Sequence, residues 1–401
     1  RTCIPINETD FTNIGAVVVS ASEMDVLDNE QIRSFGIPAI VMVVDPSHTI
    51  YFDMERIGAV IDITSNSIND YKWTIEQIVA SYEALILPPF FKALSDYVGD
   101  NNAQFDCPGH QGGQFFTKHP TGRAFYDFFG DHIFRADLCN ADVKLGDLLI
   151  HEGHAHDAQA HAAAVYNADK TYFVLNGTSS ANKVVLNALL TPGDIILYDR
   201  NNHKSICHGG LVMSGATPIY LETARNPFGS IGGILEHCFD ESYIRNLIHE
   251  KDPNKAKADR PIRLAVIQLG TYDGTIYNAR QVVDKIGHLC DYIFFDSAWV
   301  GYEQFIPMMK DCSPLLLELG PNDPGILVTQ SVHKQQAGFS QTSQIHKKDK
   351  HIKGQDRYVD HKRFNNSFMM HDTTSHFYPI FASLDVNAKI HESELLKQLR
   401  I

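Results

Sequence analysis

The sequence predicts an α/β fold built around a mostly parallel sheet. Three observations support this prediction: apolar runs of strand length recur along the chain, segments of helical character separate them, and no internal repeat interrupts the alternation. Parallel strands require such crossover connections. In folds of this class, the side chains that bind ligands lie at the carboxyl ends of the strands.

Length and composition limit the classes of protein to consider. The 401-residue chain is long enough for one large domain and a smaller one. Its formal net charge of −14 argues against a nucleic-acid backbone as partner, and no run approaches the roughly 18 apolar residues of a membrane span. The seven cysteines are scattered without a C-x-x-C pair, which is typical of reduced thiols. We therefore expect a cytoplasmic protein without a membrane segment or nucleic-acid partner.

The N-terminal residues 1–82 are predicted to form a small α/β domain of their own. Three strand-like runs are expected in it, at residues 14–19, 39–44 and 59–63. The apolar helical stretch 78–87 is expected to end at Pro88 and Pro89, because a proline pair cannot continue a helix. Residues 83–105 are predicted to be a linker.

Residues 106–390 are predicted to form the larger domain, followed by a C-terminal segment at 391–401. Five of its strands are expected at Tyr172–Leu175, Ile195–Tyr198, Leu264–Gln268, Tyr292–Phe295 and Ile326–Thr329. The basic run 346–353 is predicted to be a solvated loop or helix face.

Small polar residues follow the first of these five strands. Gly177 permits a tight turn, and Thr178 and Ser179 then stand at the start of a helix with apolar positions at 181, 184, 185, 188 and 189. Free N–H groups and hydroxyls that converge at a helix start suit a phosphate dianion. Ordinary N-capping by these residues is the alternative.

Three further strands also end in side chains that carry chemistry. His203 is placed to lay its imidazole on a flat aromatic ligand, although a structural histidine is the alternative. Asp296 follows an apolar run and needs a partner such as a protonated ring nitrogen, because an unpaired buried charge costs several kcal/mol; a helix N-cap is the alternative. Lys334 suits a cofactor anchor, and the alternative is an ordinary solvated lysine.

Four strand ends thus offer a phosphate cradle, an aromatic stacker, a carboxylate and an amine, the groups that hold pyridoxal 5'-phosphate. From about residue 105 to 390 the chain also resembles the bacterial ornithine/lysine/arginine decarboxylases, which are PLP-dependent enzymes of the aspartate-aminotransferase fold. It is most similar to the ornithine decarboxylases. The resemblance lies in the segment around Lys334 and in the motifs FDCPGHQGG (105–113), QLGTYDGT (268–275) and DSAWVGYEQF (296–305). The N-terminal residues resemble the receiver-like wing domain of this family.

The resemblance implies a role for each candidate residue. Lys334 would bind the cofactor covalently, Asp296 would pair with the pyridine nitrogen and His203 would stack on the ring. Residues at or near the phosphate would be Thr178, Ser179, Ser331 and His333, with Trp299 near the cofactor. The implied reaction is decarboxylation of a basic amino acid, L-ornithine to putrescine and CO2. The implied assembly is a homodimer or larger homo-oligomer with the active site at the dimer interface, where residues 373–375 reach the neighbour's phosphate.

The chain departs from the family pattern in three places. His154 and His376 stand where the family has proline, and the chain ends at Ile401 where family members continue through a long region that completes the substrate pocket. We therefore expect a truncated C-terminal segment. A lysine decarboxylase of the same family and a cofactor-binding but inactive subunit stay open as alternatives. Aminotransferase chemistry uses the same ring-binding parts, and only the resemblance favours decarboxylation over it.

A metal-dependent hydrolase is the alternative from a different enzyme class. It is suggested by a group of histidines and acids: His151, Glu152, His154, His156, Asp157 and His161. Their spacing does not match the His-Glu-x-x-His pattern that puts two ligands on one helix face. We therefore expect solvated histidines at a helix start and no metal.

Overall fold

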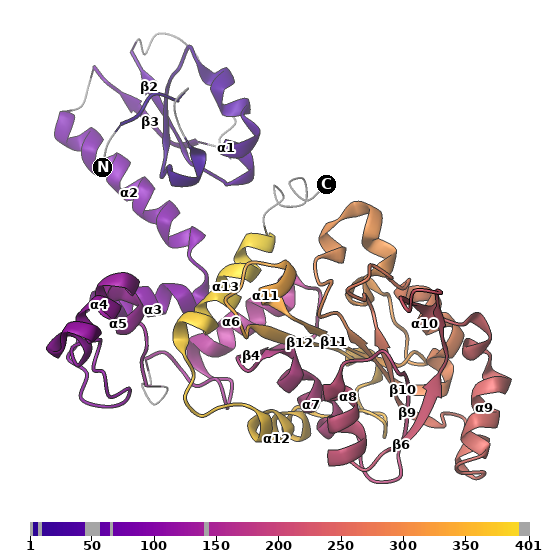
Figure 1. Cartoon of the computed structure of the whole chain (residues 1–401). Helices are drawn as coiled ribbons and strands as arrows, with labels where there is room; N and C mark the ends of the chain where they lie inside the picture. The colour runs from indigo at the N-terminus through magenta and orange to yellow at the C-terminus, as the bar shows by residue number, and fades with distance from the viewer. Residues whose placement is uncertain (1–2, 7–9, 45–56, 65–66, 140–143, 393–401) are drawn as a thin grey trace. The chain divides into compact units, whose positions relative to one another are not determined.

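The computed structural model describes residues 3–6, 10–44, 57–64, 67–139 and 144–392 (Figure 1). The chain divides into two compact units. One consists of Arg1–Pro88 with Lys389–Ile401, and the other of Pro89–Ala388. Much of the expected C-terminal segment 391–401 lies outside the described residues.

The first unit contains a three-stranded parallel sheet in the order β1-β2-β3. The strands are β1 (Val17–Ser20), β2 (Ala39–Val43) and β3 (Ile57–Asp62), and the helices are α1 (Glu30–Ser34) and α2 (Ile68–Ile86). Helix α2 begins at a capping box, in which Ser67 and Asp70 satisfy each other's backbone N–H groups. Val17, Val41 and Ile32 are buried in a small core.

The second unit is organised around a seven-stranded sheet in the order β4-β12-β11-β10-β9-β5-β6. Its strands are β4 (Lys170–Val174), β5 (Ile195–Asp199), β6 (Thr217–Leu221), β9 (Ile262–Gln268), β10 (Cys290–Asp296), β11 (Gly325–Gln330) and β12 (Ser343–Lys348). Only β12 runs antiparallel to its neighbours in this sheet. The predicted α/β class with a mostly parallel sheet is therefore confirmed.

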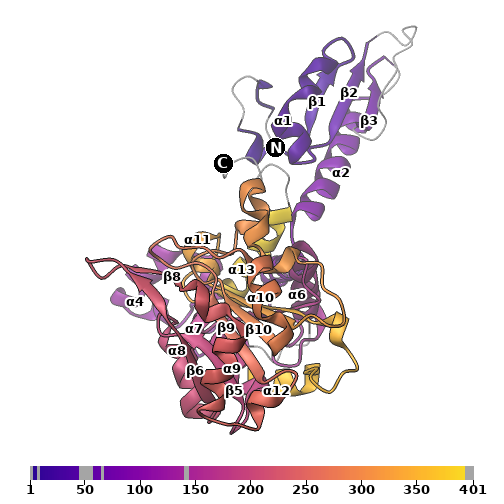
Figure 2. The same cartoon turned by 90° about the vertical axis from the view of Figure 1, so that its right-hand side faces the viewer.

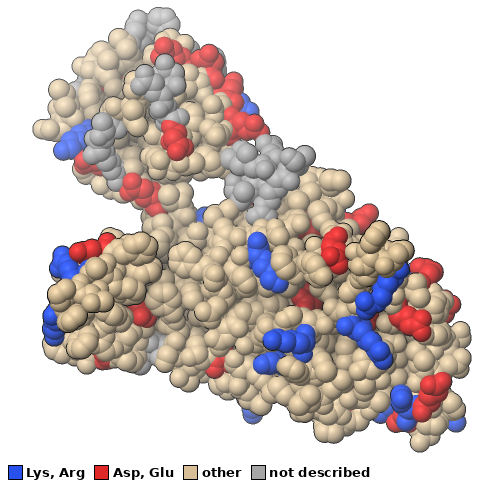
Figure 3. All heavy atoms as spheres, in the orientation of Figure 1, with Lys and Arg blue, Asp and Glu red and all other residues tan. Residues whose placement is uncertain are grey.

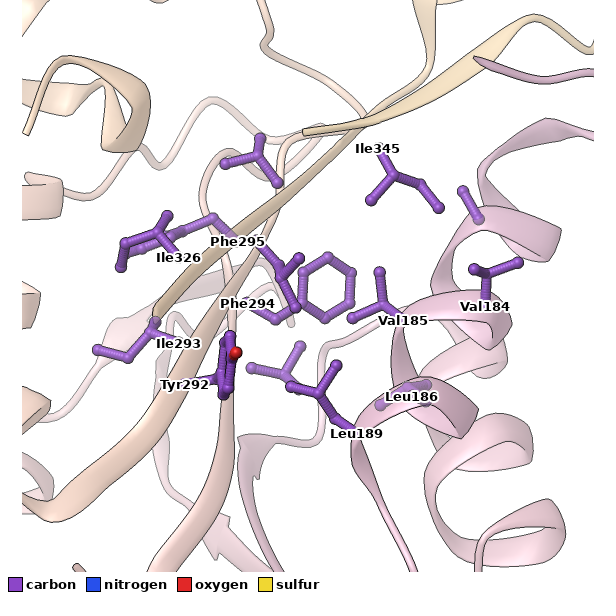
Figure 4. Close-up of a cluster of buried hydrophobic side chains, with 14 of the residues drawn as sticks. Val184, Val185, Leu186, Leu189, Tyr292, Ile293, Phe294, Phe295, Ile326 and Ile345 are labelled. Atoms are coloured by element: carbon purple, nitrogen blue, oxygen red, sulfur yellow. The ribbon is translucent and has the colours of Figure 1, made fainter. Parts of the chain in front are cut away.

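The apolar strands are buried because the sheet is covered on both faces. Side chains alternate between the faces of a strand. In Figure 4, Val185 and Leu189 of helix α7 (Gly177–Leu189) lie on the same side of β10 as Tyr292 and Phe294, and Ile293 points to the other side. The tyrosine and phenylalanine rings are fully buried, so this layer forms the centre of the core.

The helices and one small hairpin complete the second unit. The helices are α3 (Pro89–Gly99), α4 (Pro120–Phe129), α5 (Asp131–Arg135), α6 (Gly153–Val165), α8 (Lys204–Cys207), α9 (Glu241–His249), α10 (Ala279–Ile286), α11 (Val332–Gln335), α12 (His361–His371) and α13 (Tyr378–Glu392). The hairpin of β7 (Thr223–Arg225) and β8 (Ile231–Ile234) extends from the body of this unit in Figure 2. Proline is tolerated in the first turn of a helix, and Pro89 begins α3.

The prediction of a solvated loop or helix face at 346–353 is wrong for its first half. His346 and Lys347 belong to β12 and are only 0% and 3% exposed. Both side chains find partners inside the protein: His346 Nδ1 lies 2.8 Å from Thr171 Oγ1, and Lys347 forms an ion pair with Asp349. A polar strand can be buried when each polar group is satisfied in this way.

Among the residues that the structure describes, no helix is both long and apolar enough to cross a membrane. Basic and acidic side chains are intermixed on the right-hand part of the face shown in Figure 3.

Candidate active site

A tight turn joins strand β4 to helix α7. Gly177 has φ of 76°, in the left-handed region that glycine adopts at little cost, and its N–H donates to the Gln341 carbonyl at 2.8 Å. The buried Thr178 Oγ1 lies 2.6 Å from Ser331 Oγ and 2.9 Å from Ser343 Oγ. Hydroxyls from three segments therefore converge at the start of the helix, with the exposed Ser179 beside them. This donor set fits a phosphate group.

Asp296 ends strand β10 and is 2% exposed. Its Oδ2 accepts a hydrogen bond from Asn182 Nδ2 at 2.9 Å, and its Oδ1 accepts one from the Ala298 N–H at 3.1 Å. Burial raises the pKa of this carboxyl, while the two hydrogen bonds and the charges of His203 and Lys334 act in the opposite direction. Both donors are neutral, so they leave the negative charge of Asp296 uncompensated. That charge can pair with a cationic ring nitrogen.

Lys334 lies in the short helix α11, directly after strand β11. Its Nζ is 4.2 Å from the centroid of the Trp299 ring. Partial burial lowers the pKa of Lys334, and the Asp296 charge opposes that shift. A lysine with a lowered pKa has more of its amine in the unprotonated form that attacks an aldehyde.

His203 caps helix α8 at the end of strand β5. Its Nδ1 accepts from the Ser205 N–H at 3.2 Å and lies 2.8 Å from Ser205 Oγ. Burial lowers the pKa of His203, and Asp296 opposes the shift. Asn182 Nδ2 also donates to Ser205 Oγ at 3.0 Å. One hydrogen-bonded network therefore connects the imidazole to the Asp296 carboxylate.

The eight residues expected in the site come from four strand ends. They follow β4 (Thr178, Ser179), β5 (His203), β10 (Asp296, Trp299) and β11 (Ser331, His333, Lys334). These strands are parallel, so their carboxyl ends lie at one edge of the sheet. His333 is held there because its Nδ1–H donates to the Thr342 carbonyl at 2.7 Å.

Asn182, Thr329 and Ser343 are part of the site but were not expected in it. Thr329 Oγ1 donates to Asn182 Oδ1 at 2.8 Å, which orients the amide toward Asp296. One signal could have found Asn182: it is a polar residue one turn after Thr178, next to the apolar position Ala181 of the same helix. No comparable signal exists for Ser343, which reaches the site from the unpredicted strand β12.

The expected solvated histidines at 151–161 need one correction. His151 is buried, with its Nδ1 3.1 Å from Gln159 Oε1 and its Nε2 2.6 Å from Asn365 Oδ1. Burial lowers the pKa of His151 to about 4. It was expected to be solvated because its neighbours are polar, but two amide side chains enclose its ring. His156 is exposed as expected. Within the described ranges, no three His, Cys, Asp or Glu side chains are grouped to hold a metal ion.

Known proteins are similar to this chain over nearly its whole length. The chain is 66% identical to an ornithine decarboxylase of Haemophilus influenzae over all of the chain and 56% of the relative. It is 64% identical to the inducible ornithine decarboxylase of Escherichia coli over 98% of the chain and 54% of the relative. The solved structure of lysine decarboxylase A from Pseudomonas aeruginosa matches with a TM-score of 0.86 at 32% identity, over 97% of the chain and 53% of that structure.

The chain thus spans about half the length of the curated relatives it matches. The model of the "Orn/Lys/Arg decarboxylase, major domain" matches residues 88–400, which includes every residue of the candidate site. The chain therefore belongs to the Orn/Lys/Arg decarboxylase family.

Proposed function

We propose that this chain is the catalytic part of a PLP-dependent ornithine decarboxylase, which converts L-ornithine to putrescine and CO2. The observation that carries the proposal is the buried Asp296 carboxylate, bonded only to neutral donors, at the same sheet edge as Lys334. When bound, PLP supplies a ring that accepts the electron pair left by the departing carboxylate.

Asp296 and Lys334 have the central roles in this proposal. Lys334 would hold the cofactor covalently, and its lowered pKa makes the amine available. Asp296 keeps a proton on the pyridine nitrogen, because a carboxylate in a site of low dielectric pairs firmly with a cation. Asn182 holds that carboxylate in place. His203 would stack on the ring, and Trp299 would lie near the cofactor.

The cofactor phosphate would be held at the turn before helix α7. Thr178, Ser179, Ser331 and His333 are the residues proposed to bind it or to lie close to it. The hydroxyl of Thr178 already lies within hydrogen-bonding distance of the Ser331 hydroxyl, so a phosphate oxygen would meet preorganised donors.

Ornithine is favoured as substrate by the relatives. Proteins named ornithine decarboxylase are 60–66% identical to this chain, whereas those named lysine decarboxylase are 37–41% identical. We also propose a cytoplasmic homodimer or larger homo-oligomer, with residues 373–375 reaching the neighbour's phosphate. The division into a receiver-like wing (1–82), a linker (83–105), a PLP-binding domain (106–390) and a C-terminal segment (391–401) belongs to the same proposal.

Competition among substrates tests the proposal. The PLP-saturated chain is offered equal concentrations of ornithine, lysine and arginine, and the amines formed are identified by mass spectrometry. We expect putrescine to dominate. In parallel, borohydride reduction followed by peptide mapping should place the cofactor on Lys334. Cadaverine as the main product would favour the lysine decarboxylase alternative, and cofactor on Lys334 without any amine would favour an inactive cofactor-binding subunit.

A further inference from the structure

A cavity opens at the end of the large sheet opposite to the candidate active site. Its volume is about 510 Å³, and it is lined by residues of β4, β12 and the segments that follow β12. Lys347 of β12 pairs with Lys170 of β4 in the sheet, whereas Ser343 pairs with Val174. Four residues of strand separate these two pairs, which corresponds to roughly 14 Å. The cavity is therefore distinct from the site at Thr178.

The cavity lining is rich in lysine. Lys170, Lys347, Lys350 and Lys353 line it, together with two aspartates, Asp169 and Asp349. On the right-hand part of the face in Figure 3, basic side chains lie beside acidic ones. Within the cavity, lysines outnumber carboxylates by four to two.

Asp349 forms an ion pair with Lys347 and accepts a hydrogen bond from the Tyr292 hydroxyl, at 2.9 Å from Asp349 Oδ2. Asp169 binds backbone groups: its Oδ2 accepts from the N–H of Asp349 at 2.8 Å and from the N–H of Lys350 at 2.7 Å. These bonds fix the turn after β12 against β4. The cavity lining as a whole therefore carries four ammonium groups against two carboxylates, an excess of positive charge.

Lys170, one of the lysines of this cavity, contacts a histidine and not a carboxylate. Its Nζ lies 3.0 Å from His361 Nδ1. A lysine ammonium can only donate, so this imidazole nitrogen accepts and the ring is neutral. Burial and the charge of Lys347 lower the pKa of Lys170. Across the described part of the chain, no ion pair joins Lys170, Lys350 or Lys353 to a carboxylate.

We propose that this cavity is a binding site for a small phosphate-bearing anion with two or more negative charges, held by Lys170, Lys350 and Lys353. The volume falls in the range of small-molecule sites. Lysine is a common point-charge ligand for phosphate. Lys350 and Lys353 are exposed at the rim, where they meet an incoming anion, and Lys170 is half-buried below them.

Isothermal titration of the PLP-saturated chain with pyrophosphate tests the proposal, since the occupied cofactor site cannot then compete. We expect one binding site per chain. The double variant Lys350→Ser/Lys353→Ser should weaken binding at least tenfold, because the two ammonium groups contribute much of the attraction. The control Lys251→Ser/Lys257→Ser removes the same charge at exposed positions outside the cavity and should change the affinity less than twofold.

Lys170→Met supplies a second variant that keeps most of the side-chain volume, with thermal unfolding as the check on its fold. It too should weaken pyrophosphate binding at least tenfold. Absence of binding to the unaltered chain, equal losses in the two double variants, or equally tight binding of citrate would each overturn the proposal. These outcomes do not depend on the decarboxylase activity, because no step of the titration requires turnover.

Discussion

Replacing Asn182 with alanine removes the group that orients the Asp296 carboxylate. The amide donates to Asp296 Oδ2 at 2.9 Å and accepts from Thr329 Oγ1 at 2.8 Å. After the substitution, Asp296 keeps its bond from the Ala298 N–H, and Ser205 keeps its contact with His203. The substitution therefore removes the charge-assisted bond to Asp296, the bond to Ser205 Oγ at 3.0 Å, and the acceptor of the Thr329 hydroxyl.

The size of the effect follows mainly from the loss of the bond to Asp296 and of the acceptor for Thr329, because Ser205 keeps its contact with His203. A hydrogen bond to a charged group contributes about 1.5–3 kcal/mol, and a buried hydroxyl without a partner costs about 1–3 kcal/mol. We expect Asn182→Ala to lower the free energy of unfolding by roughly 3 kcal/mol. In a unit of this size that corresponds to a fall in Tm of about 6 °C. The pKa of Asp296 should also rise further, because Asn182 holds it down.

Differential scanning calorimetry of the cofactor-free chain measures this effect. Asn254→Ala is the control, because Asn254 is exposed and its side chain makes no capping bond. A double-mutant cycle with Asp296→Asn should give a coupling energy of about 1–2 kcal/mol, since the two residues are in contact. A Tm for Asn182→Ala within about 1 °C of the unaltered chain would refute the assignment of this amide as the support of Asp296.

Three further predictions concern other parts of the second unit. Lys334→Ala should abolish both CO2 release from ornithine and the borohydride-stable cofactor adduct. Asp296→Asn should retain bound cofactor but lose most of the rate of CO2 release. Turnover near that of the unaltered chain in either variant would reject the roles given to these residues. His151 has its pKa lowered by burial from 6.5 to about 4, so the unfolded chain takes up a proton first as the pH falls. The stability that neutral His151 contributes is thus present above pH 6.5 and is lost toward pH 4, by about 3 kcal/mol at most. His151→Gln should flatten the dependence of Tm on pH between these two values. An unchanged slope would contradict the reasoning. Gly177→Ala forces φ of 76° on a residue with a side chain, in a place where an added Cβ meets nothing within 4 Å, so backbone strain alone should cost about 1–2 kcal/mol and weaken PLP binding. Gly99→Ala, at a position with ordinary φ and equal space, should cost nothing measurable by the same calorimetry.

The parallel strands could be predicted because burial on both faces requires continuous apolar residues. Tyr292–Phe295 is such a run, and the side chain that follows it, Asp296, had to lie at the ligand-binding edge. The turn at Gly177 could also be predicted, because a glycine between a strand and an amphipathic helix can adopt the positive φ of a tight turn. Most candidate side chains could thus be located from strand ends alone.

Strand β12 could not be predicted, because its burial depends on partners far away in the sequence. Gln344 Nε2 donates to Gln330 Oε1 at 2.7 Å, and His346 lies against Thr171. A hydropathy pattern contains no information on such pairings, so the basic residues 346–348 of this strand are predicted to be solvated. The burial of His151 could not be predicted for the same reason, since its partners Gln159 and Asn365 come next to it only on folding.

The position of β12 also has a consequence for biosynthesis. Among the residues that the structure describes, strand β12 is the one neighbour of β4 in the large sheet, and the pairing of Val174 with Ser343 spans 343 − 174 = 169 residues. On the ribosome, β4 therefore emerges long before the strand that covers its edge, and an uncovered edge is a template for intermolecular pairing. Nascent chains arrested before residue 343 should consequently depend on chaperones, whereas a released chain that contains β12 can pair it with β4.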